Sequence, residues 1–376
     1  MKKYFKYARL AFMDTTEKTN YQAELFSNRL KKKYKELRKW ARKNNVSCYR
    51  LYDRDIPEIP LSLDIYEFLP ENIKTPAECT AFMQEQNARI SQNDPQIEKE
   101  ITERRYAVLY LYERPYEKEQ SEEEEWLNLM AKTAAEILGV KESHIVKKMR
   151  KMQKGTSQYE KKHSEEKIEG LVQEQGGLFK IDLSTYLDTG LFFDHRPLRK
   201  TVRESSNGKR VLNLFCYTGS FSVYALQGNA AFVESVDLSN TYLTWAQENA
   251  KLNGFRNKEK YNYIKADVIE WLEKRAAHIE EEKKYDLIIL DPPTFSNSKS
   301  TENVLDINRD WPSLVENCVK LLKSNGELYF STNSTRLKFD EKLLPKNTEC
   351  SDITAPSIPK DFEGSKCHRA WKIKLY

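Results

Sequence analysis

Short apolar runs separated by helical patterns dominate the second half of the chain. Each run has the length of a buried strand, and between the runs apolar residues recur at helical spacing. The expected strands are residues 211–215, 231–238, 261–266 and 285–290, and the expected helices are residues 220–226, 242–253, 267–277 and 311–322. Strands that alternate with helices predict right-handed crossovers and a mostly parallel sheet with helices on both faces. Residues 327–331 and 370–375 are expected to complete the sheet as an antiparallel pair.

The first half of the chain is more polar and less regular. Apolar residues at helical spacing over residues 20–44 predict one long amphipathic helix with basic residues between them. Residues 71–104 are polar and weakly patterned, so we expect a loop or an insertion there. The other expected elements are short strands and turns within 48–70, a strand at 106–112, a helix at 126–138, and a mobile loop followed by a hairpin within 155–177.

The length of 376 residues suits two domains, each able to bury its own apolar centre. We expect an α+β accessory domain with an N-terminal helix over residues 1–185 and a Rossmann-like α/β domain over residues 186–376. No apolar run approaches the roughly 20 residues that span a bilayer, and the N-terminus lacks a secretory signal, so a cytoplasmic location is expected. The six cysteines form no CxxC pair or His/Cys cluster, so neither disulfides nor a metal site is expected.

The net charge of +5 is only mildly basic, but it is unevenly distributed. Positive charge is concentrated at residues 29–43 and 147–154, and negative charge at residues 119–125. One interpretation is that these runs are solvated helix surfaces. Aromatic residues among the basic ones favour a second interpretation, an RNA-binding surface where cations neutralise phosphates and aromatic rings stack on bases.

Candidate cofactor-binding residues follow the first three predicted strands. In a doubly wound sheet, ligands lie beyond the carboxyl ends of the strands, where Gly219 opens the first turn. Because the Gly-x-Gly-x-x-Gly fingerprint is absent, NAD and FAD are disfavoured. Asp237 could accept both hydrogens of a ribose diol, while Asp267 could receive an adenine amino group and Val268 could supply a backbone amide. The alternative for each Asp is a helix N-cap.

The sequence Asp291-Pro292-Pro293-Thr294-Phe295 follows the fourth predicted strand. The two prolines fix the backbone and remove two amide donors, which leaves carbonyls and the Asp291 carboxylate as acceptors. Phe295 could cover a flat ring. The alternative is a Pro-Pro turn that only ends the strand. Beside a cofactor site, the turn indicates methyl transfer to a nucleic-acid base.

Four motifs resemble the class I S-adenosylmethionine-dependent methyltransferases and, most closely, the guanine-N7 methyltransferases of bacterial 23S rRNA. These motifs are Asp188–Pro197, Asn213–Ser220, Val236–Ser239 and Asp291–Lys299. The resemblance extends over most of the chain. In that family the N7 enzyme is commonly fused to a half that methylates guanine N2, and this half is missing here. The resemblance therefore implies the N7 activity alone, and leaves open whether a separate chain supplies the N2 activity.

The resemblance also implies roles for individual residues. Asp194 and Arg196 are expected at the methionine end of S-adenosylmethionine, with Arg196 pairing with its carboxylate. Asp237 is expected to bind the ribose hydroxyls. The other residues implied at the cofactor are Asn213, Phe215, Tyr217, Thr218, Gly219, Leu238 and Ser239. For His195 an orienting or packing role is favoured over that of a catalytic base.

Guanine N7 carries a lone pair, so its attack on the sulfonium methyl needs positioning but no prior loss of a proton. A flipped guanine is expected to stack on Phe295, with Asp291 accepting from its N1 or amino hydrogens. The expected partner is 23S rRNA or an assembling large-subunit particle. Methylation of rRNA cytosine C5 would instead need a cysteine nucleophile, and residues 330–334 contain none. A third possibility is a non-catalytic RNA-binding factor for ribosome assembly.

Overall fold

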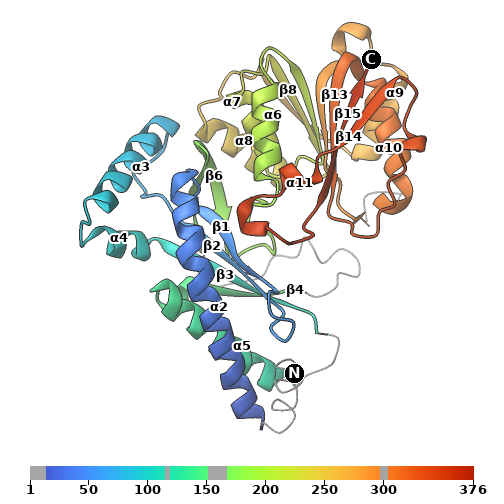
Figure 1. Ribbon diagram of the computed structural model, residues 1–376. Helices are drawn as coiled ribbons and strands as arrows, with labels where there is room; N and C mark the ends of the chain where they lie inside the picture. The colour runs from blue at the N-terminus through green and yellow to red at the C-terminus, as the bar shows by residue number, and fades with distance from the viewer. Residues whose placement is uncertain (1–13, 115–118, 151–166, 297–303) are drawn as a thin grey trace. The chain divides into compact units, whose positions relative to one another are not determined.

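The computed structural model describes residues 14–114, 119–150, 167–296 and 304–376 (Figure 1). The chain divides into two compact units, Met1–Pro70 with Ala81–Gln153, and Glu71–Thr80 with Lys154–Tyr376. The boundary expected at residue 185 differs from this division. Strands β5 (Glu169–Glu174) and β6 (Gly177–Asp182) form an antiparallel hairpin that belongs to the second unit. The loop expected before this hairpin, over residues 155–166, lies outside the described residues.

Two asparagines, one in helix α8 (Asn240–Leu252) and one at its C-cap, attach this hairpin to the second unit. Asn249 Oδ1 accepts from the backbone amide of Lys180 at 3.0 Å, and Asn253 Oδ1 accepts from that of Leu178 at 2.9 Å. Asn253 Nδ2 donates back to the Leu178 carbonyl at 2.7 Å. Because these partners lie far apart along the chain, the local pattern of residues 155–177 could not indicate this attachment.

The first unit has a four-stranded sheet in the order β1-β2-β3-β4, in which β3 and β4 are parallel and the other pairs are antiparallel. Its strands are β1 (Cys48–Asp53), β2 (Leu61–Glu67), β3 (Arg105–Tyr112) and β4 (Ile145–Arg150). Helices α2 (Thr15–Lys43) and α5 (Gln120–Leu138) share one apolar core with the sheet. Buried Trp126 of α5 donates from Nε1 to Gln22 of α2 at 2.7 Å, which joins the two helices. The long amphipathic helix and the helix ending at Gly139 are thereby confirmed.

A loop or an insertion was expected over residues 71–104, and the loop was a wrong prediction. The segment contains helices α3 (Pro76–Ser91) and α4 (Ile97–Glu103). Thr75 and Glu78 form a capping box: Thr75 Oγ1 accepts from the Glu78 amide at 3.3 Å, and the Glu78 carboxylate accepts from the Thr75 amide at 2.9 Å. With Pro76 at the first helical position, this signal was readable in the sequence.

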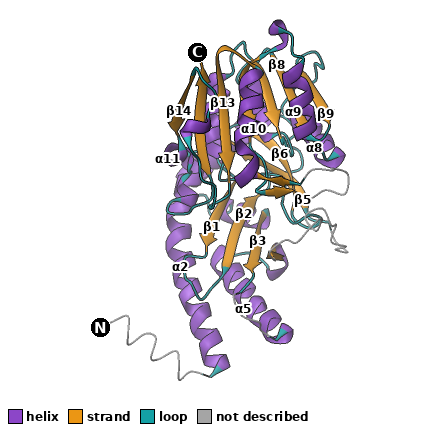
Figure 2. Cartoon of the chain, turned by 90° about the vertical axis from the view of Figure 1, so that its right-hand side faces the viewer, coloured by secondary structure: helices purple, strands orange, loops and turns teal. Residues whose placement is uncertain are grey.

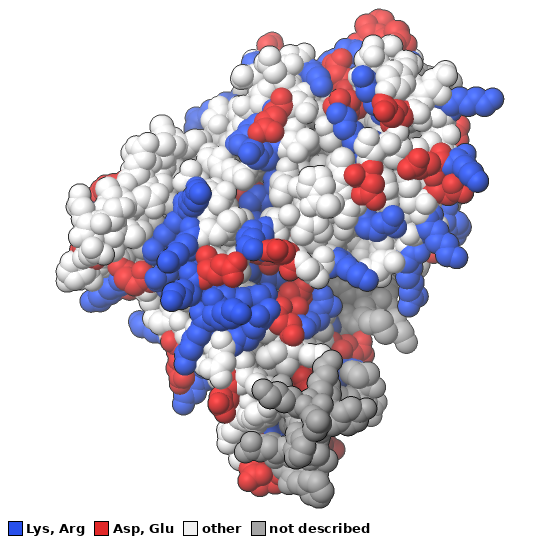
Figure 3. Space-filling view, in the orientation of Figure 1, with Lys and Arg blue, Asp and Glu red and all other residues white. Residues whose placement is uncertain are grey.

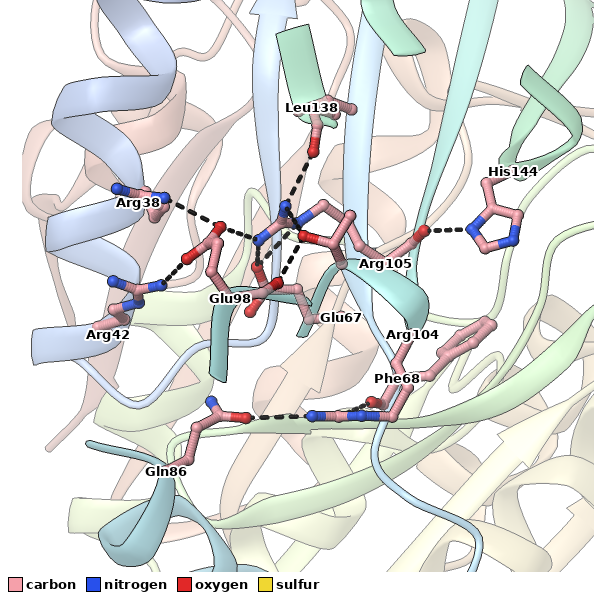
Figure 4. A network of polar contacts seen from close by, with 11 residues as sticks. Arg38, Arg42, Glu67, Phe68, Gln86, Glu98, Arg104, Arg105, Leu138 and His144 are labelled. Carbon is pink, nitrogen blue, oxygen red and sulfur yellow. Dashed lines mark hydrogen bonds and ion pairs between the residues drawn. The ribbon is translucent and has the colours of Figure 1, made fainter. Parts of the chain in front are cut away.

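Arg105, at the start of β3, is the centre of a buried network of charges (Figure 4). Its side chain is 1% exposed, and it donates to Glu67 Oε1 and to the Leu138 carbonyl, both at 2.9 Å. Glu98 of α4 lies 3.4 Å from the same guanidinium and also pairs with two arginines of α2. The network therefore joins β2, β3, α2 and α4 through one buried cation.

The basic residues of α2 are partly engaged in ion pairs within the first unit. These pairs are Arg29 and Lys33 with Asp55, and Arg38 and Arg42 with Glu98. In the second basic run Lys148 is buried, and residues 151–154 lie outside the described residues. On the face drawn in Figure 3, Asp and Glu side chains lie among the Lys and Arg side chains. Among the described residues, the two runs therefore present fewer free cations than the sequence indicates.

The second unit has a seven-stranded sheet in the order β14-β15-β13-β10-β7-β8-β9. Its strands are β7 (Arg210–Leu214), β8 (Phe232–Asp237), β9 (Tyr261–Lys265), β10 (Tyr285–Leu290), β13 (Leu322–Thr332), β14 (Thr348–Asp352) and β15 (Arg369–Leu375). The five strands from β13 to β9 are parallel, and β15 runs antiparallel to both β13 and β14. The expected antiparallel pair is confirmed. Strand β14 was not expected, because its sequence is polar and largely exposed.

Helices cover both faces of this sheet, with α6 to α8 on one side and α9 and α10 on the other (Figures 1 and 2). The helices are α6 (Arg196–Ser205), α7 (Ser220–Gln227), α8, α9 (Val268–Ala277), α10 (Ile307–Lys320) and the short α11 (Thr354–Ser357). A two-residue pair, β11 (Phe295–Ser296) with β12 (Leu305–Asp306), follows β10. The expected Rossmann-like α/β fold is confirmed.

Removing the charge on Glu67 should strongly destabilise the first unit, because the buried Arg105 guanidinium would lose its nearest carboxylate. We expect Glu67→Gln to lower the free energy of unfolding by about 3 kcal/mol, measured by urea denaturation. Arg42→Gln is the matched control, since its partner Glu98 is 48% exposed. The control should cost less than about 1 kcal/mol. Equal losses in both variants would contradict the central role of Arg105.

Candidate active site

The second unit contains a cavity of about 230 Å³ at the carboxyl ends of β7, β8, β9 and β10. Carboxyl ends of parallel strands meet at one edge of a sheet, which explains why motifs distant in sequence converge there. The residues expected from the sequence that line it are Asp194, Phe215, Tyr217, Asp237, Leu238, Asp267, Val268, Asp291, Pro292 and Pro293. Lining residues to which the sequence analysis assigned no role include Asp188, Phe192, Arg199, Tyr242 and Asn333.

The turn after β7 has an unusual backbone. Phe215, Tyr217 and Gly219 all have positive φ angles, of 54°, 49° and 72°. The left-handed region costs a non-glycine residue on the order of 1 kcal/mol or more, so the surroundings must hold this turn in place. Asp237 does so, because its Oδ2 accepts from the Tyr217 amide at 2.9 Å.

Asp237 has a second backbone partner, the amide of Ser239, which donates to Oδ1 at 2.8 Å. Burial raises the pKa of the Asp237 carboxyl, and the backbone amides that donate to it act in the opposite direction. The residue also lines the cavity. Its carboxylate therefore joins the turns after β7 and β8 and presents acceptor oxygens beside the cavity.

Gly219 is required for the packing of α7 against α8. A Cβ atom built on it would lie 2.7 Å from the Ala246 Cβ of α8, and Gly219 does not line the cavity. The packing explains the glycine without a ligand, and the expected approach of a ligand to its backbone stays a prediction. A side chain here would separate α7 from α8 as well as strain the turn.

The helix N-cap interpretation holds for Asp267 but not for Asp237, because the N-cap of α8 is Ser239. Asp267 Oδ1 accepts from the amides of Ile269 and Glu270 at the start of α9, at 2.8 and 3.2 Å. Asp267 and Val268 also line the cavity, so capping does not exclude a second role. Ser239 caps α8 by accepting from the Tyr242 amide at 3.3 Å, and it lies outside the lining.

Asp291 ends β10 and is linked through His195 to a second carboxylate. Ser331 donates to Asp291 Oδ1 at 2.6 Å. His195 Nε2 lies 3.3 Å from the same oxygen, and its Nδ1 lies 3.3 Å from Asp194 Oδ2. Neither histidine contact has good hydrogen-bond geometry, so we treat both contacts as ion pairs. His368 also approaches Asp194 Oδ2, at 3.1 Å, and its ring stacks on His195.

These contacts decide which groups are charged. Burial opposes a charge on His195, but the carboxylates of Asp291 and Asp194 outweigh it and raise the pKa of the imidazole to about 10. Burial likewise opposes ionisation of Asp291, but His195 and the hydroxyl of Ser331 hold its pKa below the usual value. At neutral pH the site therefore contains an imidazolium between two carboxylates, which fits an orienting role for His195.

Asp194, His195 and His368 place potential metal-ligand atoms within 4.8 Å of one another. The two imidazole rings are stacked, however, with centroids 4.4 Å apart and planes at 19°. Nitrogen lone pairs lie in the ring plane, so stacked rings do not direct them at one ion.

The structure does not bring Arg196 to the cavity. Its side chain is 1% exposed, and its guanidinium donates to Glu174 at 2.8 Å and to Asp361 at 2.9 Å. Arg196 begins α6, whose first turn directs this side chain toward the β5–β6 hairpin. The expected contact of Arg196 with the methionine carboxylate is therefore corrected.

Three other expected residues lie outside the lining. Asn213 is buried and donates to the Ser222 hydroxyl at 2.8 Å. Thr218 is buried and donates to the Gly190 carbonyl at 2.6 Å. Phe295 is 54% exposed in β11, directly after the Pro-Pro turn, so its ring is available to an external partner.

Helical periodicity could have indicated one residue that we missed. Arg199 lies three positions after Arg196 and four after His195, so all three share one face of α6. Asn333 had a weaker signal, as it follows β13 directly. It accepts a hydrogen bond from the Thr294 hydroxyl, which joins it to the turn after β10.

Comparison with known proteins gives a consistent result. A model of the S-adenosylmethionine-dependent methyltransferase family matches residues 94–358. Ribosomal RNA large subunit methyltransferase K of Neisseria meningitidis is 40% identical over 349 residues, which cover 93% of this chain and 86% of that protein. The chain belongs to the S-adenosylmethionine-dependent methyltransferase family.

Other relatives are longer. Ribosomal RNA large subunit methyltransferase K/L of Magnetococcus marinus is 39% identical over 93% of this chain, but the match covers 43% of that protein. The chain thus spans less than half the length of the K/L relatives. A solved methyltransferase structure complexed with SAH has a TM-score of 0.65 at 19% identity, covers 94% of this chain and 82% of its own, and supports the fold alone. Among the described residues, none of the helices is long and apolar enough to cross a membrane.

The cofactor of this methyltransferase family is S-adenosylmethionine, and the chemistry of the cavity fits it. Asp237 offers carboxylate oxygens to ribose hydroxyls, while Leu238, Val268 and Ile269 offer apolar surface to an adenine ring. The carboxylates of the lining suit a ligand with a sulfonium and an ammonium group. When bound, the cofactor supplies the electrophilic methyl group.

Gly219→Ala should destabilise the protein more than Gly254→Ala. Both glycines have positive φ, but a methyl group added at Gly254 would meet no atom within 4 Å, whereas one added at Gly219 would meet Ala246. We expect a loss of about 1 kcal/mol for Gly254→Ala from backbone strain alone, and at least about 2 kcal/mol for Gly219→Ala. Equal losses in chemical denaturation would show that α7 and α8 can separate freely.

Stability should fall between pH 6.5 and pH 10 because of His195. The folded pKa of about 10 exceeds the ordinary value of 6.5, so the stabilisation is complete below pH 6.5 and disappears as the pH rises through 10. We expect His195→Gln to flatten this part of the dependence of melting temperature on pH. Parallel curves for the wild type and the variant would contradict a charged His195.

Proposed function

We propose that this protein transfers a methyl group from S-adenosylmethionine to N7 of a guanosine in 23S rRNA. The observation that carries the proposal is the pair of ionic contacts beside Asp291, in which His195 lies 3.3 Å from both Asp291 and Asp194. His195 already holds its proton at neutral pH, and Asp291 is a weak base because its pKa is lowered. Such a site suits a nucleophile that has a lone pair and needs no deprotonation, as guanine N7 does. Kinship with the ribosomal RNA large subunit methyltransferases K supports the RNA substrate.

A covalent mechanism through cysteine has less support. Cys216 lines the cavity, but burial and the neighbouring Asp237 carboxylate raise its pKa well above the usual value. Cys318 is buried within α10, where burial also raises its pKa. A thiol with a raised pKa is a poor nucleophile at neutral pH. The alternative of cytosine C5 methylation is therefore disfavoured.

The Asp291 carboxylate has an oxygen available for the base. Ser331 and His195 both face Oδ1, while Oδ2 has no hydrogen-bond partner among the described residues. In the proposed complex Oδ2 accepts from the guanine N1 or amino hydrogens, and Phe295 stacks on the ring. The N7 lone pair forms the new bond to the methyl carbon as the bond from carbon to sulfur breaks. Positive charge then develops on the guanine, so the contact with Asp291 strengthens in the transition state.

The first unit supplies a candidate RNA-binding surface on α2. After the ion pairs of that helix are set aside, exposed lysines remain. These lysines are Lys31, Lys32, Lys35, Lys39 and Lys43. They can neutralise phosphates of 23S rRNA or of an assembling large-subunit particle. This role implies a cytoplasmic location.

Asp291→Ala should separate cofactor binding from methyl transfer. We expect binding of S-adenosylhomocysteine to stay within about threefold of the wild type, and methylation of undermethylated 23S rRNA to fall on the order of a hundredfold. Asp286→Ala is a matched control, because Asp286 lies at the other end of the same strand. Undiminished turnover in Asp291→Ala would remove this residue from the mechanism.

The same assay identifies the modified atom. Label from S-adenosylmethionine should appear at a guanosine where the RNA chain is cleaved by aniline after reduction, as expected for N7-methylguanine. Label that resists this cleavage would overturn the N7 proposal and favour another atom or base. Cofactor binding without any transfer would favour the non-catalytic assembly factor.

A further inference from the structure

The charges around the cavity are strongly unequal. The lining carboxylates are those of Asp188, Asp194, Asp237, Asp267 and Asp291. Among the described residues of the lining, Arg199 is the one Arg or Lys side chain. S-adenosylmethionine carries two cationic groups and one carboxylate, so its single anion has few partners in such a cavity.

The other cation of the lining is engaged on both sides. His195 directs Nδ1 at Asp194 and Nε2 at Asp291, each at 3.3 Å. A ligand carboxylate at His195 would have to displace one of these protein carboxylates or lie beside it. Repulsion between like charges at such short range makes this position unfavourable.

Arg199 has a donor group left over. Its Nε and Nη2 donate to Glu174 Oε1 at 2.9 and 2.7 Å, which occupies one edge of the guanidinium. Its Nη1 has no hydrogen bond to any described residue, although the side chain is 1% exposed and borders the cavity. A guanidinium presents five N–H donors in a planar fork, so binding one carboxylate leaves donors for a second.

Glu174 holds this guanidinium in place. Its side chain is fully buried, and it accepts from Arg196, Arg199 and the Tyr224 hydroxyl. Arg196 also donates to Asp361, so the two arginines differ in what they can still bind. The shared carboxylate therefore fixes both side chains but leaves only Arg199 beside the cavity.

We propose that Arg199 binds the carboxylate of the methionine part of S-adenosylmethionine through Nη1, with Glu174 as the positioning residue. Arg199 thus takes the role that the sequence motif indicated for Arg196. The inference rests on the cofactor and is independent of the choice of guanine N7, because binding can be measured without RNA.

The test compares two ligands that differ at the proposed contact. S-adenosylhomocysteine has the amino-acid carboxylate, whereas 5′-methylthioadenosine keeps the adenosine and the thioether but lacks the whole amino-acid end. For Arg199→Gln in the full chain, we expect calorimetry to show roughly tenfold to hundredfold weaker binding of S-adenosylhomocysteine. Binding of 5′-methylthioadenosine should change by less than about threefold. Decarboxylated S-adenosylmethionine, which keeps the ammonium group, should also be insensitive to the substitution.

Arg196→Gln is the matched control. It breaks an equally buried ion pair with Glu174 and should lower the melting temperature. The ratio of the affinities for S-adenosylhomocysteine and 5′-methylthioadenosine should nevertheless stay that of the wild type. If Arg199→Gln fails to fold, Arg199→Lys keeps a cation beside Glu174 and allows the same comparison. We then expect the ratio of the affinity for S-adenosylhomocysteine to that for 5′-methylthioadenosine to fall at least about threefold. An unchanged ratio in the Arg199 variant would overturn the proposal, and so would a ratio that falls only in Arg196→Gln. Failure of the wild type to methylate rRNA while it binds S-adenosylhomocysteine would affect the proposed function alone.

Discussion

The burial of Glu174 is the constraint on which the active-site end of the second unit depends. A carboxylate with no solvent contact must be compensated by cations and donors, and here two guanidinium groups and a tyrosine hydroxyl provide them. Because those groups come from α6 and α7, one ionised side chain of the β5–β6 hairpin fixes the position of both helices. The start of α6 in turn places Asp194 and His195, and His195 contacts both Asp194 and Asp291 at 3.3 Å.

Buried carboxylates need compensating donors, which explains why the acidic residues of the site have more than one partner. Asp237 accepts from backbone amides in two separate turns and also borders the cavity. Asp267 caps a helix and borders the cavity as well. Groups that are already hydrogen-bonded keep their rotamers when a ligand enters, so little conformational freedom is lost on binding. The positive φ angles after β7 are tolerated for the same reason, since Asp237 holds the turn.

Much of the fold could be predicted from the sequence, because strands with continuous apolar runs and helices with regular periodicity are set by local pattern. The parallel strands, the late antiparallel pair and the convergence of Asp237 and Asp291 on one cavity followed from it. The predictions that failed concerned contacts between distant parts of the chain or the direction of a side chain. The hairpin is attached by asparagines at the end of α8. The motif that contains Arg196 did not show which of the two buried arginines of α6 borders the cavity. Helices α3 and α4 were missed for another reason. The apolar residues of α3 are only weakly periodic, and its capping box was overlooked.

The excess of carboxylates over cations around the cavity has a consequence for turnover. Transfer of the methyl group converts a sulfonium into a neutral thioether, so the spent cofactor has one positive charge fewer than the fresh one. Among the described residues, five aspartates line the cavity, and these carboxylates favour the loaded cofactor electrostatically. The lining carboxylates thus favour replacement of the spent cofactor by S-adenosylmethionine, without any conformational change.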